Sequence, residues 1–299
     1  MQLSVIILNY NTFDLTCQCI QSVIAHTKAI DYEIILVDNA STECNPHLFT
    51  EKYPDIKLIK NTQNYGFAKG NNIGISKALG SYILLLNSDT VLLNNAAKLC
   101  VDYLLQNPNV GVVTCMIQSS DGTLQFPAER FPSLKNEFRE LFRMNKFLSE
   151  AQKSQLYLGA AFNHLSGKEA DWVWGTFFMF SKQSLQKLPG KQLNDSLFMY
   201  GEDMIWCTGF ARAGYKMAYY PAAKIIHFGG SNTEQAGYSE KFKSRIFPNT
   251  YRALIYRYNK LYVWILYFIK ALHLCSLRNK TDLGKALFIF RFLFFRKLH

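Results

Sequence analysis

The chain has 299 residues, of which 49% are hydrophobic, and this is enough for the core of one large domain and excludes a largely disordered protein. Its net charge of +11 comes from 33 basic and 22 acidic side chains. Residues 241–299 alone hold 13 of the basic and 1 of the acidic side chains, together with 14 aromatic residues. We therefore interpret the chain as a nearly neutral body, residues 1–240, followed by a basic, aromatic tail, residues 241–299.

The seven cysteines are odd in number and scattered, with no CxxC pair, which argues against a disulfide framework or a zinc site. We expect free thiols in a reducing compartment. The first residues lack the basic segment and long apolar run of a signal peptide. These features predict a cytoplasmic protein.

Short apolar runs alternate with amphipathic ones along the body, a pattern typical of a mostly parallel α/β sheet flanked by helices. The expected strands are residues 3–8, 33–37, 56–59, 82–86, 110–115 and 224–226. The expected helices are residues 13–26, 71–79, 90–107 and 204–213. Residues 118–170 form a polar insertion with one amphipathic stretch, residues 134–147, and such a segment often supplies a lid or a specificity element.

Polar residues follow several of these strands, where the binding crevice of a parallel sheet lies. Asp38 directly follows a strand and could accept hydrogen bonds from a nucleotide base or ribose, or it could cap the next helix. In the segment Asn87-Ser88-Asp89, the last acid could hold a divalent cation on a diphosphate. One carboxylate makes a metal site only if the phosphates supply most of the other ligands.

Two further segments carry candidate chemistry. Glu202 and Asp203 open a predicted helix, where they could cap the helix or where the helix dipole could keep a carboxylate ionised as a general base. His227 follows a strand and could ligate a metal, contact a phosphate or be purely structural. The two tryptophans of segment 171–175 could be a sugar platform or part of a buried strand.

The order of these segments over residues 3–235 resembles the family 2 inverting glycosyltransferases, which have the GT-A fold. Within that family the chain is most similar to rhamnosyltransferases that extend lipid-linked bacterial polysaccharides. The segments that carry the resemblance are Asn9-Tyr-Asn11, Asp38, Asn64-Tyr-Gly-Phe-Ala-Lys-Gly-Asn-Asn72, Asn87-Ser-Asp89, Asp171-Trp-Val-Trp-Gly175, Tyr200-Gly-Glu-Asp203 and His227-Phe-Gly-Gly-Ser231.

The resemblance implies a nucleotide-sugar site at the first of these segments. Asn11 and Asp38 match the positions that hold the nucleotide base. Asn64, Gly66 and Asn72 match the loop and helix start that close over the nucleoside.

The resemblance also implies a divalent metal, Mg²⁺ or Mn²⁺, on the donor diphosphate. Asp89 matches the last acid of the family's DxD motif, and His227 matches a histidine that ligates the metal or touches the phosphates. Asn87 stands at the first position of the motif, and it departs from the family pattern by removing one carboxylate from the nucleotide-sugar site.

The remaining matched positions concern the transfer itself. Trp174 and Gly175 correspond to the segment beside the donor sugar and the acceptor, where Glu202 is also expected. Asp203 matches the catalytic base, which would take the proton of an acceptor hydroxyl as it attacks the anomeric carbon from the face opposite the nucleotide. The configuration would invert in one step.

The tail predicts an amphipathic helix at an anionic membrane surface. Placed on one helical wheel, the basic residues of 250–278 fall within a sector of about 140°. The longest apolar run, residues 261–269, is too short to span a bilayer, and a second apolar segment covers residues 286–295. A helical pair packed on the body or in a dimer interface is the alternative. Nucleic acid is not an expected partner, because the aromatics are massed with aliphatic residues.

Together these features predict a metal-dependent inverting glycosyltransferase at the inner face of the cytoplasmic membrane, acting in bacterial cell-surface polysaccharide synthesis. The expected donor is a dTDP- or UDP-sugar, with dTDP-rhamnose as a candidate, and the expected acceptor is a lipid-linked saccharide. The alternative is a non-catalytic scaffold that binds nucleotide sugars or glycans. A nicotinamide-dependent oxidoreductase is disfavoured, because the first strand is not followed by GxGxxG.

Overall fold

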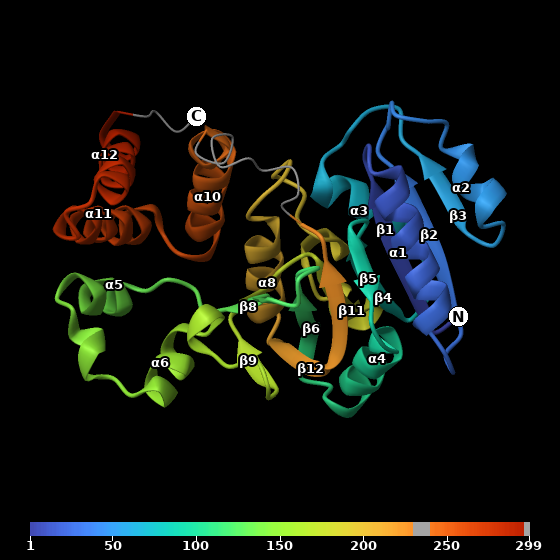
Figure 1. The fold of residues 1–299 in the computed structure, drawn as a ribbon, viewed down its shortest axis with the longest axis horizontal. Coiled ribbons are helices and arrows are strands. Elements are labelled where there is room, and N and C mark those ends of the chain that lie inside the picture. Colours follow the sequence, from blue (N-terminus) through green and yellow to red (C-terminus); the bar gives the residue numbers. More distant parts are fainter. Residues whose placement is uncertain (230–239, 296–299) are drawn as a thin grey trace.

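The computed structural model describes residues 1–229 and 240–295, and its centre is one large mixed β-sheet (Figure 1). The first four strands of the sheet order are parallel, and the next strand, β11, runs antiparallel to both of its neighbours. In spatial order the strands are β3 (Lys57–Lys60), β2 (Tyr32–Asp38), β1 (Leu3–Asn9), β4 (Tyr82–Asn87), β11 (Phe177–Ser181), β6 (Val110–Gln118), β12 (Lys216–His227) and β5 (Thr90–Leu92).

Helices cover both faces of this sheet. One face carries α1 (Phe13–His26) and α4 (Ala96–Gln106), and the other carries α3 (Phe67–Lys77) and α8 (Glu202–Arg212). Two short helices, α2 (His47–Lys52) and α7 (Lys182–Leu185), connect strands at the periphery.

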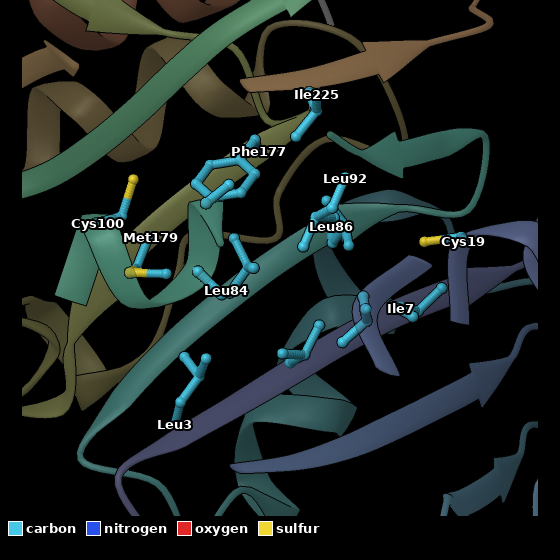
Figure 2. Packing of buried hydrophobic residues seen from close by; sticks show 14 of the residues in the cluster. Leu3, Ile7, Cys19, Leu84, Leu86, Leu92, Cys100, Phe177, Met179 and Ile225 are labelled. Atoms are coloured by element: carbon cyan, nitrogen blue, oxygen red, sulfur yellow. The ribbon is translucent and has the colours of Figure 1, made fainter. Parts of the chain in front are cut away.

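Alternation of apolar side chains along the strands creates the two layers of core. Ile7 packs into the layer under α1 and α4, whereas its neighbour Ile6 packs into the layer under α3 and α8. Figure 2 shows the first layer, in which side chains from β4 and β11 lie together with Cys100 of α4. All seven cysteines are free thiols, as the sequence predicts.

The insertion between β6 and β11 is fastened to the sheet by short strands. β7 (Leu124–Gln125) pairs with β6, β9 (Lys168–Ala170) pairs with β12, and β8 (Ala128–Glu129) pairs with β10 (Trp172–Val173). Between these strands lie α5 (Leu134–Leu141) and α6 (Glu150–Tyr157). The insertion is therefore held against the body at both of its ends.

In the described part of the tail, residues 241–295, a short π-helix (Phe242–Ile246) is followed by the α-helices α10 (Phe247–Arg257), α11 (Lys260–Ser276) and α12 (Lys280–Phe295). The single helix assumed over residues 250–278 is wrong, because α10 ends at Arg257 and Asn259 caps a new helix by accepting a hydrogen bond from the backbone N–H of Tyr262 at 2.8 Å. The basic residues therefore do not share one helical face. Arg257, for example, lies over the ring of Phe131 at 4.1 Å.

The tail packs on the body as well as on itself. A third hydrophobic cluster joins Phe247 and Leu254 of α10 to Met204 and Ile205 of α8. Figure 1 shows α10, α11 and α12 grouped on one side of the sheet, with α11 next to α5 of the insertion. Among residues 1–229 and 240–295, no helix is long and apolar enough to cross a bilayer.

The elements that the sequence predicts for the body are present, but several differ in their bounds. The expected helix 90–107 begins only at Ala96, because Thr90–Leu92 forms the edge strand β5. The expected helix 71–79 is shifted toward the N-terminus and covers Phe67–Lys77. The expected strand 224–226 is the end of the longer β12, and β11 was not predicted.

Candidate active site

A cleft of about 760 Å³ opens at the carboxyl end of β4. It lies between the sheet, the start of α8, the insertion and the first turn of the tail. Its lining includes seven of the residues that the sequence singles out: Asn87, Asp89, Trp174, Gly175, Glu202, Asp203 and His227. Four others that it singles out, Asn11, Asp38, Asn64 and Asn72, and the glycine Gly66 do not line this cleft.

Asp89 and His227 face each other on one wall of the cleft. The pairing of β5 with β12 places Thr90 opposite His227, and the backbone N–H of Phe228 donates to the carbonyl of Asp89 at 2.9 Å. As a result, Asp89 Oδ1 lies 3.4 Å from His227 Nε2. A carboxylate oxygen and an imidazole nitrogen thus converge on one point of the wall.

Gln125 fixes which nitrogen of His227 is available. Its Nε2 donates to the carbonyl of His227 and to Ser119 Oγ, both at 3.0 Å, so its Oε1 faces His227 Nδ1 at 2.8 Å. Because Oε1 can only accept, Nδ1 is the ring nitrogen that donates to Gln125, and Nε2 is the one that faces Asp89 and could bind a metal. Sequence reasoning missed Gln125, which lies on a two-residue strand of the polar insertion.

Asn87 lines the same cleft as Asp89 and His227 and offers a further oxygen ligand. Its backbone N–H donates to the carbonyl of Thr176 at 3.0 Å, while its side-chain Oδ1 is buried without a hydrogen-bond partner among the described residues. Oxygen and imidazole donors of this kind suit Mg²⁺ or Mn²⁺. In the described part of the chain, no three or more His, Cys, Asp or Glu residues are placed so that they could hold a metal ion by themselves, so a cation here would need further ligands from a bound diphosphate.

Asp203 also lines the cleft, from the first turn of α8. Gly201 begins the helix with a φ of +86°, and an added Cβ there would lie 3.0 Å from the carbonyl oxygen of Asn249 in α10. Asp203 Oδ1 accepts from the backbone N–H of Met204 at 2.9 Å, and Oδ2 accepts from that of Gly175 at 3.4 Å. The carboxylate is held in place and oriented by these two donors.

Burial sets the charge of the two adjacent acids. It raises the pKa of Asp203 above its ordinary value, and burial together with the charge of Asp203 raises the pKa of Glu202. Glu202 Oε2 is buried without a partner among the described residues, whereas Asp203 has two N–H donors. Asp203 is therefore the ionised member. The helix dipole, on which the sequence prediction rests, favours the ionised carboxylate and therefore opposes the effect of burial.

Glu129 is a third carboxyl in the cleft, and it was not predicted. Its Oε1 accepts from the indole Nε1 of Trp174 at 3.2 Å. Burial raises its pKa to about 7, with the nearby Asp203 adding to the rise and the Trp174 hydrogen bond opposing it. Glu129 thus fixes the ring of Trp174 beside Asp203. The sequence offers no local signal for it, because its position depends on the two-residue pairing of β8 with β10.

Asp38 and Asn11 shape a loop next to the cleft. Asp38 is only 1% exposed, and its oxygens accept from Asn9 Nδ2 at 2.7 Å and from the backbone N–H of Ser41 at 3.0 Å. It does not cap the next helix, which begins at His47. Asn11 is exposed and accepts from the backbone N–H of Thr42 at 2.7 Å. Their contact with a base stays a prediction.

Asn64 and Gly66 belong to a second loop, which is organised by Asn39. Asn64 Oδ1 accepts from Asn39 Nδ2 and from the backbone N–H of Gly66, both at 2.8 Å. Gly66 has a φ of +81°, and a Cβ there would lie 2.4 Å from the carbonyl oxygen of Phe198. Only glycine fits this approach of the loop to the segment before α8.

Asn72 faces away from the cleft. Its Nδ2 donates to the carbonyl of Leu193 at 2.8 Å, and its Oδ1 accepts from the N–H of the same residue at 3.2 Å. Both polar atoms therefore hold the chain before α8. Residues 230–232 of the histidine segment lie outside the described residues.

Residues 4–189 match the model of Glycosyl transferase family 2. The chain belongs to this family, and it is a glycosyltransferase. A curated relative from Mycobacterium tuberculosis, N-acetylglucosaminyl-diphospho-decaprenol L-rhamnosyltransferase, is 20% identical over 216 residues, 67% of each chain. A poly(ribitol-phosphate) beta-glucosyltransferase of Bacillus spizizenii is 36% identical over 94 residues, 30% of this chain and 15% of that protein. The resemblance to the rhamnosyltransferases is confirmed at low identity.

Solved structures confirm the predicted GT-A fold. The chain superposes on S. aureus TarS 1-349 with a TM-score of 0.56 at 14% identity, covering 97% of this chain and 91% of that one. It superposes on GalNAc-T7, solved with UDP, GalNAc and Mn²⁺, with a TM-score of 0.62 at 15% identity, covering 96% and 53%. For the mannosyltransferase PcManGT of Pyrobaculum calidifontis, solved with GDP-Man and Mn²⁺, the TM-score is 0.52 at 16% identity, covering 98% and 69%.

Proposed function

We propose that this glycosyltransferase transfers a sugar from a nucleotide-sugar donor to a saccharide acceptor with inversion at the anomeric carbon, and that Asp203 is the catalytic base. The observation that carries the proposal is that one cleft is lined both by the buried carboxylate of Asp203 and by the Asp89–His227 pair. In the reaction we propose, Asp203 faces the acceptor hydroxyl, and Asp89 with His227 faces the leaving diphosphate of the donor.

Asp203 supports a single displacement. Its carboxylate takes the proton of the acceptor hydroxyl while the hydroxyl oxygen forms a bond to the anomeric carbon. The bond from that carbon to the diphosphate oxygen breaks with its electron pair going to the diphosphate. A raised pKa makes Asp203 a stronger base than an ordinary aspartate while leaving it ionised near neutral pH.

Asp89 and His227, with Asn87 Oδ1, would hold a Mg²⁺ or Mn²⁺ ion on the donor diphosphate. When bound, this ion neutralises the charge that develops on the leaving group. The donor set fits such an ion, and two of the structurally similar proteins were solved with Mn²⁺. The hydrogen bond of Nδ1 to Gln125 leaves Nε2 of His227 as the ring nitrogen that would ligate the ion.

The relatives guide the substrates that we propose. The mycobacterial relative is named for a rhamnose transfer to a lipid diphosphate saccharide, and the structural relatives were solved with GDP-Man or UDP. We therefore propose a dTDP- or UDP-sugar donor, with dTDP-rhamnose as the first candidate, and a lipid-linked saccharide acceptor used in cell-surface polysaccharide synthesis. Asn11, Asp38, Asn64, Gly66 and Asn72 would build the nucleoside end of the site, chiefly through the loops they shape.

The substitution Asp203→Asn tests the catalytic base. We expect kcat for sugar transfer to fall by about 10²–10⁴-fold, because the amide cannot accept the hydroxyl proton. Binding of UDP or dTDP with Mn²⁺, measured by thermal shift, should remain. Asp195→Asn, at an exposed aspartate outside the cleft, is the matched control. Retained turnover in the Asp203 variant would remove this residue as the base.

The substitution Gln125→Leu tests the metal site without touching a proposed ligand. Loss of the Nδ1 partner frees the ring of His227 to rotate or to change tautomer, so we expect Mn²⁺ affinity in the presence of UDP to fall by about 10- to 100-fold. Titration of Mn²⁺ followed by calorimetry gives the constant. Gln155→Leu, on exposed α6, should leave it unchanged. Equal affinity in the two variants would argue against His227 as a ligand.

We also propose that one surface of the insertion and tail contacts the anionic inner face of the cytoplasmic membrane. Both segments expose large apolar side chains and carry basic ones, and Arg143 Nη2 joins the two segments by donating to the carbonyl of Ser276 at 3.4 Å. The exposed apolar residues are Phe138, Phe142, Met144 and Phe147 of the insertion and Leu272, Leu277, Leu283 and Leu287 of the tail. Arg278, Lys280 and Lys285 supply positive charge that favours anionic lipid.

The double substitution Phe142→Ser with Leu277→Ser tests this surface. It removes apolar side chains that are 66% and 40% exposed, so folding should survive while insertion into the lipid interface weakens. In flotation with phosphatidylglycerol vesicles we expect at least a fivefold loss of bound protein. Leu79→Ser, at a 63% exposed leucine between α3 and β4, is the control. Equal flotation of wild type and double variant would contradict the membrane surface.

A further inference from the structure

A second cavity, of about 340 Å³, lies between the insertion and the tail. Its walls come from α5 and the end of α6 on one side and from α10 and α11 on the other, in the region where Figure 1 shows α5 next to α11. It shares Glu129, Trp172, Met204 and Thr250 with the active-site cleft. The two spaces therefore adjoin at these four residues, of which Met204 directly follows Asp203 in the sequence, whereas Asp89 and His227 line only the cleft. Ligand pockets in proteins are about 300–1,000 Å³, so this cavity is large enough for a small ligand.

Two residues that line this cavity, Glu137 and Trp172, each carry a polar atom with no hydrogen-bond partner among the described residues. Glu137 is only 5% exposed, its Oε2 is buried without a hydrogen bond among the described residues, and its Oε1 lies 3.9 Å from Lys270 Nζ. The indole Nε1 of Trp172 is also buried without a partner in the described chain. A buried acceptor and a buried donor left unpaired are costly, and such groups in a cavity are typical of a ligand site. Burial raises the pKa of Glu137 to about 7.

The composition of the walls selects the ligand. The cavity is lined by the carboxyl groups of Glu129, Glu137 and Glu140 and by two cations, Lys270, which faces Glu137, and Arg130, which is paired with Asp171 at 3.0 Å. Because the acids outnumber the cations and each cation already faces a carboxyl group, a phosphate or diphosphate is disfavoured. A sugar ring suits these walls, since each hydroxyl can both donate to a carboxylate and accept from an indole N–H. The apolar faces of Phe131, Tyr157 and Tyr267, which also line the cavity, suit the C–H face of such a ring.

We propose that this cavity is a second acceptor subsite, which binds the sugar next to the one that receives the new residue. This inference rests on the proposed function, because it takes Asp203 as the point at which the acceptor hydroxyl reacts. Glu137 would accept from a hydroxyl of the second sugar, and Trp172 would donate to another. The diphosphate of a lipid-linked acceptor then lies beyond the acidic cavity, so the preferred acceptor has at least two sugars.

Binding to immobilised glycans tests the subsite. The array carries bacterial monosaccharides and, for each of them, the di- and trisaccharides that have the same sugar at their end. It is probed with the 299-residue chain. We expect di- and trisaccharides to retain at least tenfold more protein than the matching monosaccharide. Glu137→Met, which keeps the side-chain volume and removes both oxygens, should reduce this retention at least fivefold. Leu156→Trp, which fills the cavity from its wall, should do the same.

The control and the contradicting outcomes are as follows. Glu150→Met alters an exposed glutamate of α6 outside the cavity and should bind as wild type does. Equal retention of mono- and disaccharides, no retained glycan, or an unchanged Glu137→Met would each overturn the subsite. Thermal shift by UDP with Mn²⁺ on the same proteins reports folding and donor binding. A missing UDP shift with intact glycan selectivity would reject the proposed donor and leave the subsite standing.

Discussion

The segment Trp174-Gly175-Thr176, immediately before β11, makes hydrogen bonds to three residues that line the cleft. The Thr176 carbonyl accepts from the backbone N–H of Asn87, which fixes the end of β4 that carries Asp89. The Gly175 N–H donates to Asp203, and the Trp174 indole donates to Glu129. A Cβ on Gly175 would lie 3.0 Å from the ring of Phe67, so any larger residue here would require that ring to shift. These three hydrogen bonds hold the end of β4, which carries Asp89, and the proposed base Asp203 in fixed positions.

Burial gives the acids of the cleft different charges. Glu129, Glu202 and Asp203 all have raised pKa values, and only Asp203 is held by two backbone donors. When neighbouring carboxyl groups have different pKa values, one site can provide both an ionised base and neutral hydrogen-bond donors. The body carries little net charge, so in the mechanism we propose a cation at Asp89 and His227, rather than basic side chains, meets the anionic donor.

Those site residues that directly follow or begin a regular element could be predicted from the sequence. Asp89, Asp203 and His227 are of this kind, because a strand or helix end fixes their position within one or two residues. Glu129 and Gln125 could not be found, since they sit on two-residue strands whose pairing is decided by long-range contacts. Asn72 matched a motif but turns to Leu193, a choice that depends on the packing of the chain before α8.

The tail shows the same limit and leads back to the base. The sequence predicts helix in the tail, but it does not predict the break at Asn259 or the packing of α10 on Met204 and Ile205. This packing helps to bury the start of α8, and burial is what raises the pKa of Asp203.

The pH dependence of kcat/KM for sugar transfer tests this account most directly. A base whose pKa is raised by burial loses activity as the pH falls through that raised value. The account predicts an acid limb clearly above pH 3.8, the ordinary value for aspartate, and its loss in Asp203→Asn. A limb at the ordinary value, or one that persists in the variant, would contradict it.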